Sequence, residues 1–137
     1  MIYMLTLETA FVQAVKNGKK TIEVRTRIPR KLSSGDILLI AQKSSHGRVA
    51  LRCRVAQILA IDPETLFSDY GHLLYCSHSY YKQYTHGRNI VYAIVLTEIF
   101  EFPETITTQS FAIDRAPQWF TFVCPSRYLY IMNSVLN

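Results

Sequence analysis

Hydrophobic and polar residues follow two different rhythms in the first part of the chain. The run Met1–Leu7 is mostly apolar and predicts a short strand. In the next stretch, Glu8–Asn17, the apolar residues Phe11, Ala14 and Val15 recur at the i, i+3, i+4 spacing of an amphipathic helix. The chain therefore begins with a strand followed by a helix.

A second strand follows this helix almost at once. Residues 21–26 alternate strictly between polar and apolar side chains. Because successive side chains of a strand point to opposite faces, Ile22 and Val24 share one face. Glu23 and Arg25 then lie together on the other face. We therefore expect these two charged residues to be neighbours.

The middle of the chain predicts two more strands. The continuous apolar run Ile37–Ala41 is typical of a strand that is buried on both sides. From Arg48 to about Ile61 the pattern alternates again and predicts a longer strand. We expect this strand to have an apolar inner face, made by Val49, Leu51, Cys53 and Val55. Its outer face should carry a stripe of three arginines, namely Arg48, Arg52 and Arg54.

Helix and strand patterns continue in the second half of the chain. Asp62 and Pro63 combine an acidic N-cap with a proline at the first helical position, which predicts a helix. A tyrosine-rich segment comes next, then a long strand at Ile90–Phe102 and a short one at Gln118–Val123. The 137 residues have room for one core, so we expect a single α+β domain.

Composition narrows the class of protein. The hydrophobic content of 49% is normal for a globular domain, and no apolar run approaches the roughly 20 residues of a membrane helix. The first residues lack the basic start and long apolar centre of a signal peptide. These features predict a cytoplasmic protein with no membrane partner.

The cysteines suggest no special chemistry. Cys53, Cys76 and Cys124 are odd in number and far apart, which predicts neither a disulfide framework nor a CxxC motif. We expect each to be a small buried hydrophobe. Cys76 with His78 and His86 matches no standard zinc spacing. The sequence therefore predicts no metal site and no cofactor.

Charge is distributed unevenly. Residues 16–54 hold eleven of the fifteen lysines and arginines but only two acids, a net charge of +9, whereas the remainder of the chain sums to −4. Such a segment favours a polyanionic partner, although net charge indicates long-range attraction and does not identify a particular binding site. A solvated basic face is the simpler alternative.

One motif within the basic segment suggests a family. The string Gly18-x-Lys20-x-x-Glu23-x-Arg25 lies at the predicted junction of helix and strand, and Gly35-Asp36 opens the next strand. This pattern resembles the ASCH domain (activating signal cointegrator homology). The resemblance covers about residues 2–103, and residues 104–137 look like a C-terminal extension of unassigned role. It implies a PUA-like fold, which is a small, partly open β-barrel with flanking helices and a cleft beside the motif.

The family resemblance implies three candidate activities: RNA binding, ribonuclease activity and amide hydrolysis of N4-acetylcytidine. For the last, the family's lysine falls on Lys20, which would serve as base or nucleophile. However, those enzymes have a threonine where this chain has Glu23, and their catalytic glutamate aligns near Leu73 or Leu74. Only Lys20 carries over, so we expect no release of cytidine.

A ribonuclease needs a general base, a general acid and a cation that stabilises the phosphorane. Lys20 or Arg25 would supply the cation. The acid and base would have to come from the four histidines, His46, His72, His78 and His86. Three of these, His46, His78 and His86, lie in loop-like sequence, where a histidine is usually inert.

Binding fits the residues better than hydrolysis. RNA-binding sites place cations on phosphates and aromatic rings on bases. We expect Lys20, Glu23 and Arg25 to bind a ligand in one concave site, with Lys20 at its edge. Glu23 would accept from an exocyclic amine, pair with its neighbouring cations, or do both. Further nucleic-acid contacts are expected from Lys19, Arg27, Arg48, Arg52, Arg54, Tyr80 and Tyr81.

The tyrosine-rich segment would form the opposite wall of this site. About three of its five tyrosines are expected to be partly buried, because aromatic rings usually pack in cores. If Arg52 and Arg54 both contact phosphates, their removal should flatten the salt dependence of RNA binding by roughly one to two units. The sequence thus predicts a module that binds RNA or a modified nucleotide. The alternative is a hydrolase with Lys20 in its active site.

Overall fold

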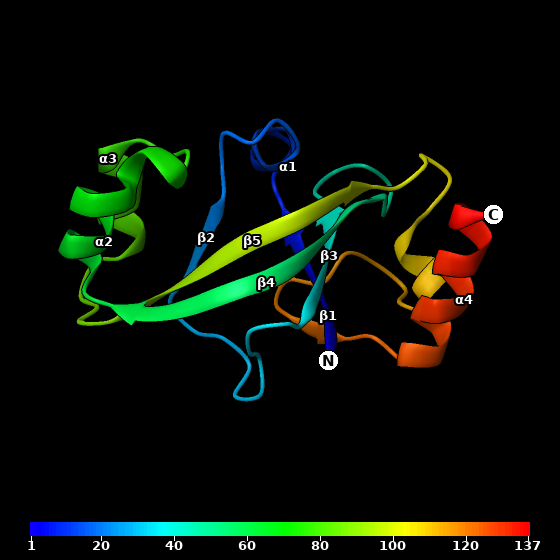
Figure 1. Ribbon diagram of the computed structural model, residues 1–137. Helices are drawn as coiled ribbons and strands as arrows, with labels where there is room; N and C mark the ends of the chain where they lie inside the picture. Colours follow the sequence, from blue (N-terminus) through cyan, green and yellow to red (C-terminus); the bar gives the residue numbers. More distant parts are fainter.

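A curved six-stranded sheet forms the centre of the computed structural model, which describes residues 1–137 (Figure 1). The strands follow the spatial order β2-β5-β4-β3-β1-β6. In chain order the elements are β1 (Ile2–Leu7), α1 (Thr9–Lys16), β2 (Ile22–Arg25), β3 (Ile37–Gln42), β4 (Val49–Ile61), α2 (Pro63–Tyr70), the 3₁₀-helix η1 (Gly71–Leu73), α3 (His78–Tyr84), β5 (Val91–Glu101), the 3₁₀-helix η2 (Thr108–Phe111), β6 (Thr121–Phe122) and α4 (Pro125–Leu136).

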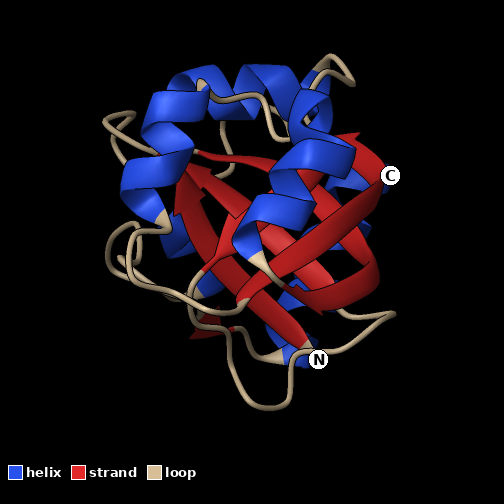
Figure 2. Cartoon of the chain, turned by 90° about the vertical axis from the view of Figure 1, so that its left-hand side faces the viewer, coloured by secondary structure: helices blue, strands red, loops and turns tan.

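The sheet is mixed and closes only half of a barrel. β1 and β3 are parallel, and every other neighbouring pair is antiparallel. The longest strands, β4 and β5, form a twisted ribbon that crosses the molecule, and helices lie over the sheet in the side view (Figures 1 and 2). The expected α+β fold with a partly open β-barrel and flanking helices is confirmed. No helix is long and apolar enough to cross a bilayer.

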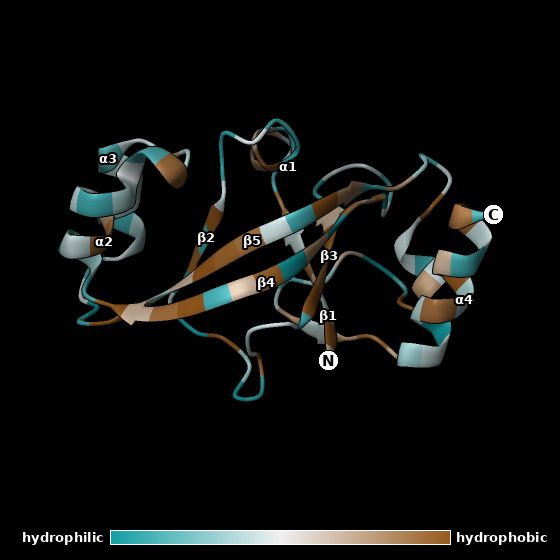
Figure 3. Ribbon diagram, in the orientation of Figure 1, coloured by the Kyte–Doolittle hydropathy of each residue, from teal (hydrophilic) through white to brown (hydrophobic).

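The inner face of the sheet carries the largest apolar cluster. It joins side chains of β1, β3, β4 and β5 to those of α1, including the fully buried Leu5, Leu38 and Leu51. The central strand β3 is drawn brown through most of its length in Figure 3, as its apolar sequence predicts. Burying this face provides the main hydrophobic stabilisation of the fold.

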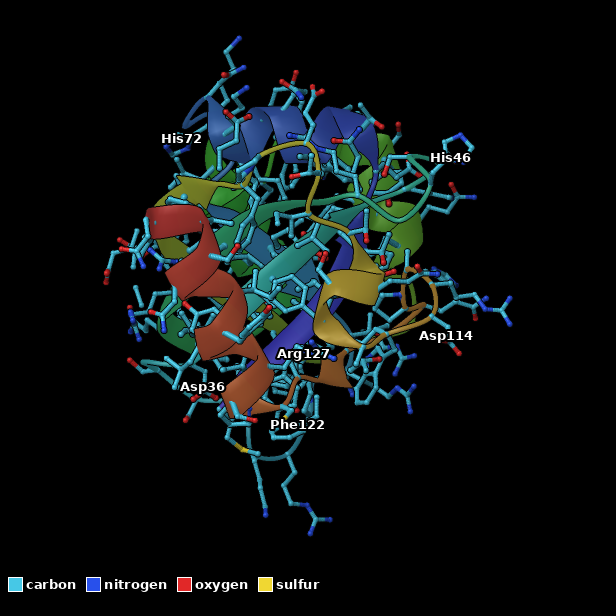
Figure 4. All side chains as sticks on the ribbon, turned by 90° about the vertical axis from the view of Figure 1, so that its right-hand side faces the viewer. Asp36, His46, His72, Asp114, Phe122 and Arg127 are labelled. Carbon is cyan, nitrogen blue, oxygen red and sulfur yellow. The ribbon has the colours of Figure 1, made fainter.

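Two further clusters cover the outer face. Residues 104–137 form η2, β6 and α4, which pack against the outer side of β1, β3 and β4 around Phe102 (Figure 4). At the other end of the ribbon, α2, η1 and α3 pack on β2 and β5 around Leu66 and Leu74. This second group of helices forms one wall of the site described below.

The long strand departs from simple alternation at its start. Ile40 pairs with Leu51, but the next residue of β3, Ala41, pairs with Val49, so Ala50 is an extra residue in β4. Because a bulge reverses the alternation, Val49 lies in the outer cluster while Ala50 and Leu51 lie in the inner one. The expectation that Val49 shares the inner face with Leu51 was wrong for this reason.

Other element boundaries differ in detail. The helix that begins at Pro63 ends at Tyr70, and η1 and a separate α3 follow it. The strand expected at Gln118–Val123 is reduced to β6, which pairs only with β1. Elements as short as these leave no clear periodic pattern in the sequence.

Candidate functional site

A cavity of about 200 Å³ lies where α1, β2 and α3 meet. It contains all three residues expected to bind a ligand, Lys20, Glu23 and Arg25. Thr6 and Phe11 also line it, and Tyr80 and Tyr84 form the α3 wall. We call this cavity the cleft.

Local sequence explains how the motif reaches the cleft. Gly18 ends α1 with φ +78°, and the backbone N–H groups of Lys19 and Lys20 both donate to the carbonyl of Ala14, at 2.9 and 3.0 Å. This tight turn suits glycine, which adopts positive φ without strain. It directs the chain from the helix straight into β2.

Alternation in β2 then separates charged from apolar side chains as predicted. Ile22 and Val24 contact the apolar cluster beneath α2 and α3, whereas Glu23 and Arg25 lie in the cleft. The predicted convergence of Glu23 and Arg25 in one concave site is therefore confirmed. Lys20 lies at the floor of this site and not at its edge, so that part of the prediction was wrong.

The Lys20 ammonium is buried, with only 4% of the residue exposed. Its Nζ donates to the carbonyl of Ile22 at 2.8 Å and to that of Leu74 at 2.9 Å, and lies 3.2 Å from Oε1 of Glu23. Three acceptors thus satisfy its three N–H groups. The acceptor on Leu74 comes from the segment after η1, which no local pattern would place there.

Glu23 joins the two cations of the site. Its Oε1 faces Lys20, and its Oε2 accepts from Nε of Arg25 at 2.7 Å. The expected ion pairing of Glu23 is present with both neighbours. Because both carboxylate oxygens are engaged, Glu23 fixes the positions of the cations.

Arg25 keeps part of its hydrogen-bonding capacity free. Its Nη2 lies 3.5 Å from the carbonyl of Thr6, its Nη1 has no hydrogen bond within the chain, and its guanidinium carbon lies 5.5 Å from the ring centre of Phe120. With two cations and one carboxylate, the floor of the cleft favours an anionic or carbonyl-rich ligand.

Aromatic rings form the outer part of the cleft. Tyr80 and Tyr84 are one helical turn apart on α3, and their rings stack with centres 6.3 Å apart. The ring of Phe11 meets Tyr80 edge-on at 6.3 Å. Tyr80 is 50% exposed, so its face is available to a ligand.

The expectation that about three of five tyrosines would be partly buried was wrong. Only Tyr81 is buried, and its hydroxyl donates to the carbonyl of Pro63 at 2.7 Å. The other four, Tyr70, Tyr75, Tyr80 and Tyr84, are exposed. Tyr80 and Tyr84 are exposed because α3 is short and packs by one face, whereas Tyr70 and Tyr75 lie outside α3.

Cys76 is the one thiol in the cleft. Burial raises its pKa, while the nearby Lys20 lowers it and Glu23 raises it. The group is therefore a neutral thiol near pH 7. A thiolate is the nucleophilic form, so this arrangement does not favour covalent chemistry.

Most of the other predicted basic contacts lie outside the cleft. Arg52 and Arg54 are on the outer face of the sheet, the side that α4 covers. Arg52 lies over the ring of Phe100, with its Nη1 3.4 Å from the Tyr128 hydroxyl. Arg54 donates to the carbonyl of Gly35 at 2.7 Å and pairs with an exposed glutamate.

The remaining predicted contacts are also separated from one another. The backbone of Arg48 forms an isolated β-bridge with Thr107. Because of the bulge in β4, its side chain does not share a face with those of Arg52 and Arg54. Lys19 is exposed at the turn after α1, and Arg27 is exposed beyond the end of β2. The basic segment therefore does not form one continuous surface.

The histidines do not approach the motif. His78 and His86 line a separate groove between α2 and α3. His46 and His72 lie at the periphery of the molecule (Figure 4). No group of three or more metal-binding side chains is present. The acid and base considered for RNA cleavage are thus not in the cleft with Lys20.

Sequence reasoning named Tyr80 but assigned no contact to Tyr84 and missed other residues of the site. The spacing of Tyr80 and Tyr84 would have revealed their shared face if α3 had been recognised as a helix. Thr6, the carbonyl of Leu74 and the ring of Phe120 carry no such signal, because they reach the site through long-range contacts.

Comparison with known proteins identifies the family. The family model of the ASCH domain matches residues 5–103. A ribonuclease from Zymomonas mobilis that contains an ASCH domain is 30% identical over 95 residues, which span 69% of this chain and 64% of that protein's length.

Solved structures share the fold. A crystal structure of the ASCH protein from Zymomonas mobilis superposes with a TM-score of 0.85 at 24% identity, covering 96% of this chain and 94% of that one. A solution structure of a protein from Pyrococcus furiosus has a TM-score of 0.53 at 20% identity, covering 71% of this chain and 96% of that one. Motif, fold and family match agree, and the chain belongs to the ASCH domain family.

Proposed function

We propose that this protein binds single-stranded RNA by holding one base in the cleft. The observation that carries the proposal is the pairing of a free guanidinium nitrogen with exposed aromatic rings. Nη1 of Arg25 lacks a partner at the floor, while Tyr80 and Tyr84 present stacked rings in the outer part of the cleft. A nucleobase has both a polar edge and a π-face, so it matches both parts of the site.

The size of the cleft supports a single base. Its volume of about 200 Å³ is below the roughly 300–1,000 Å³ of pockets that enclose drug-sized ligands. A flat ring would enter, and the ribose and phosphates would stay outside. The ligand is therefore a base extruded from a single strand or carried by a modified nucleoside.

Each motif residue has a distinct role in this proposal. Lys20 and Glu23 engage each other and their neighbours, so they hold the floor rigid. Arg25 donates to a carbonyl oxygen of the base. The name of the Zymomonas mobilis relative, a ribonuclease, supports RNA as the class of ligand.

RNA cleavage is the second candidate function, and this same relative favours it. Lys20 and Arg25 would stabilise the charge of the phosphorane. A general base is harder to assign, because Glu23 accepts from two cations and the cleft has no histidine. Amide hydrolysis is less favoured still, since Leu74 offers the cleft no carboxylate. We therefore place binding first.

The test measures binding and cleavage of one fluorescent RNA strand together. Arg25→Ala and Tyr80→Ala should each weaken binding by about tenfold, because a charged hydrogen bond or a base–aromatic stack contributes roughly 1–3 kcal/mol. Arg127→Ala is the control, since Arg127 is an exposed cation on α4 and lies outside the cleft. Binding that tolerates both cleft variants would contradict the proposal.

Cleavage is followed in the same samples by electrophoresis. We expect the strand to remain intact without added metal. Products that form with the wild type and disappear with Arg25→Ala would make cleavage the primary function.

A further inference from the structure

An exposed tryptophan lies beside the cleft, stacked with an arginine. The guanidinium carbon of Arg27 is 5.2 Å from the ring centre of Trp119. Trp119 is 39% exposed, although tryptophan is highly buried on average. It is also the single tryptophan of the chain. An exposed indole held by a cation is a surface suited to stacking.

The contact between Arg27 and Trp119 is of the same kind as the contact between Arg25 and Phe120. Arg25 lies over Phe120, and Arg27 lies over Trp119. The two rings meet edge-to-face, with centres 5.5 Å apart. Because these two rings are in contact, the exposed Arg27–Trp119 pair is the immediate neighbour of the Arg25–Phe120 pair.

The C-terminal extension supplies both rings. Phe120 is buried in the inner cluster and meets Tyr3 edge-to-face at 6.5 Å, which anchors this part of the extension. The following strand β6 pairs with β1, next to the start of the chain (Figure 1). Trp119 is therefore held in place by its neighbours and is not the tip of a long loop. Residues 119 and 120 also lie outside the segment that the family model matches.

We propose that Arg27 and Trp119 form a second stacking site, which takes the nucleotide next to the base in the cleft. This inference rests on the proposed function and extends it from one bound base to two neighbouring bases of a strand. Bases stack on indole rings and on arginine guanidinium planes, and the charge of Arg27 also attracts the intervening phosphate. The extension thereby acquires a role in RNA binding.

The single tryptophan provides a direct measurement. Titration with a six-nucleotide oligouridylate should quench the fluorescence of Trp119, whereas uridine monophosphate at equal cleft occupancy should quench it much less. The reason is that only the strand has a second base to place on the indole.

Variants extend the test to affinity. Trp119→Leu and Arg27→Ala should each weaken binding of the labelled six-nucleotide strand by about fivefold or more, given the usual contribution of one stacked base. Trp119→Phe should restore most of the affinity because it keeps an aromatic face. Tyr130→Leu is the matched control, since Tyr130 is an exposed aromatic of the same extension on α4. Thermal unfolding checks that each variant is folded.

The outcomes separate the two proposals. If the strand binds and Arg25→Ala weakens binding by about tenfold, but Trp119 fluorescence and the Trp119→Leu affinity do not change, the second site is wrong and the cleft stands. If the wild type binds neither probe, both proposals fail.

Discussion

Each residue of the motif has a physical reason for its place. Gly18 permits the positive φ that ends α1, and the buried Lys20 needs Glu23 as a partner because an unpaired charge in a protein interior is strongly unfavourable. In the second part of the pattern, Gly35 adopts φ +91° and Asp36 accepts from the backbone N–H of Ser33 at 2.9 Å. The glycines and Asp36 thus shape turns, whereas Arg25 is the motif residue with donors left for a ligand.

Removing the charge of Glu23 should be costly. Glu23→Gln leaves Lys20 and Arg25 close together without a carboxylate, and breaking a buried pair in this way typically lowers the free energy of unfolding by about 3–5 kcal/mol. Urea denaturation measures the change. Glu98→Gln is the control, because Glu98 pairs with Arg54 but its side chain is 60% exposed, and it should change the same quantity by less than about 1 kcal/mol. Equal effects of the two variants would mean that burial of the network contributes little.

At the scale of elements, the cleft depends on the helices that follow β4. The side chain of Asp62 caps α2 by accepting from the backbone N–H of Thr65 at 2.9 Å, and hydrogen bonding to Thr65 lowers the pKa of Asp62. The segment after η1 provides the Leu74 carbonyl that holds Lys20. α3 has seven residues, too few for stability alone, so its position depends on packing.

The contact that attaches α3 to α2 can be tested by removing one atom. Tyr81→Phe deletes the hydroxyl that donates to the Pro63 carbonyl, and we expect the free energy of unfolding to fall by about 0.5–1.5 kcal/mol. RNA affinity should fall as well, because Tyr80 and Tyr84 lie on the same helix. Tyr70→Phe, at an exposed tyrosine, should leave both quantities nearly unchanged. An unaltered stability for Tyr81→Phe would show that the apolar cluster alone positions α3.

At the scale of the whole molecule, the sheet separates two basic regions. Lys19 and Arg27 are exposed on the chain segments that flank the cleft residues. Arg52 and Arg54 lie on the outer face, where each contacts groups of the protein itself. A positive net charge of +5 is therefore not concentrated on one side.

Salt dependence distinguishes these regions. Each phosphate contact on a single strand contributes a slope of about −0.7 to log K against log salt, so Lys19→Ala with Arg27→Ala should flatten the slope by roughly 1.4 if both contact phosphates. We expect a smaller change for Arg52→Ala with Arg54→Ala, because Arg54 is engaged by Glu98 and Gly35. A larger effect of the second pair would identify the arginine stripe as the main phosphate surface.

The sequence by itself determined those features of this protein that lie within a single helix or strand. The strands, α1 and the start of α2 were predictable, and so was the separation of Ile22 and Val24 from Glu23 and Arg25. These features depend on the period of one element and on the backbone preferences of glycine and proline, which neighbouring residues set.

Only the tertiary structure decided the depth and composition of the site. The Leu74 carbonyl lies 54 residues from Lys20, and the ring under Arg25 comes from the C-terminal extension. The bulge at Ala50 changed which face Val49 occupies, and the packing of α2 and α3 placed His78 and His86 in a groove separate from the cleft. Register and long-range packing depend on contacts between distant segments, so the periodicity of a single segment does not specify them.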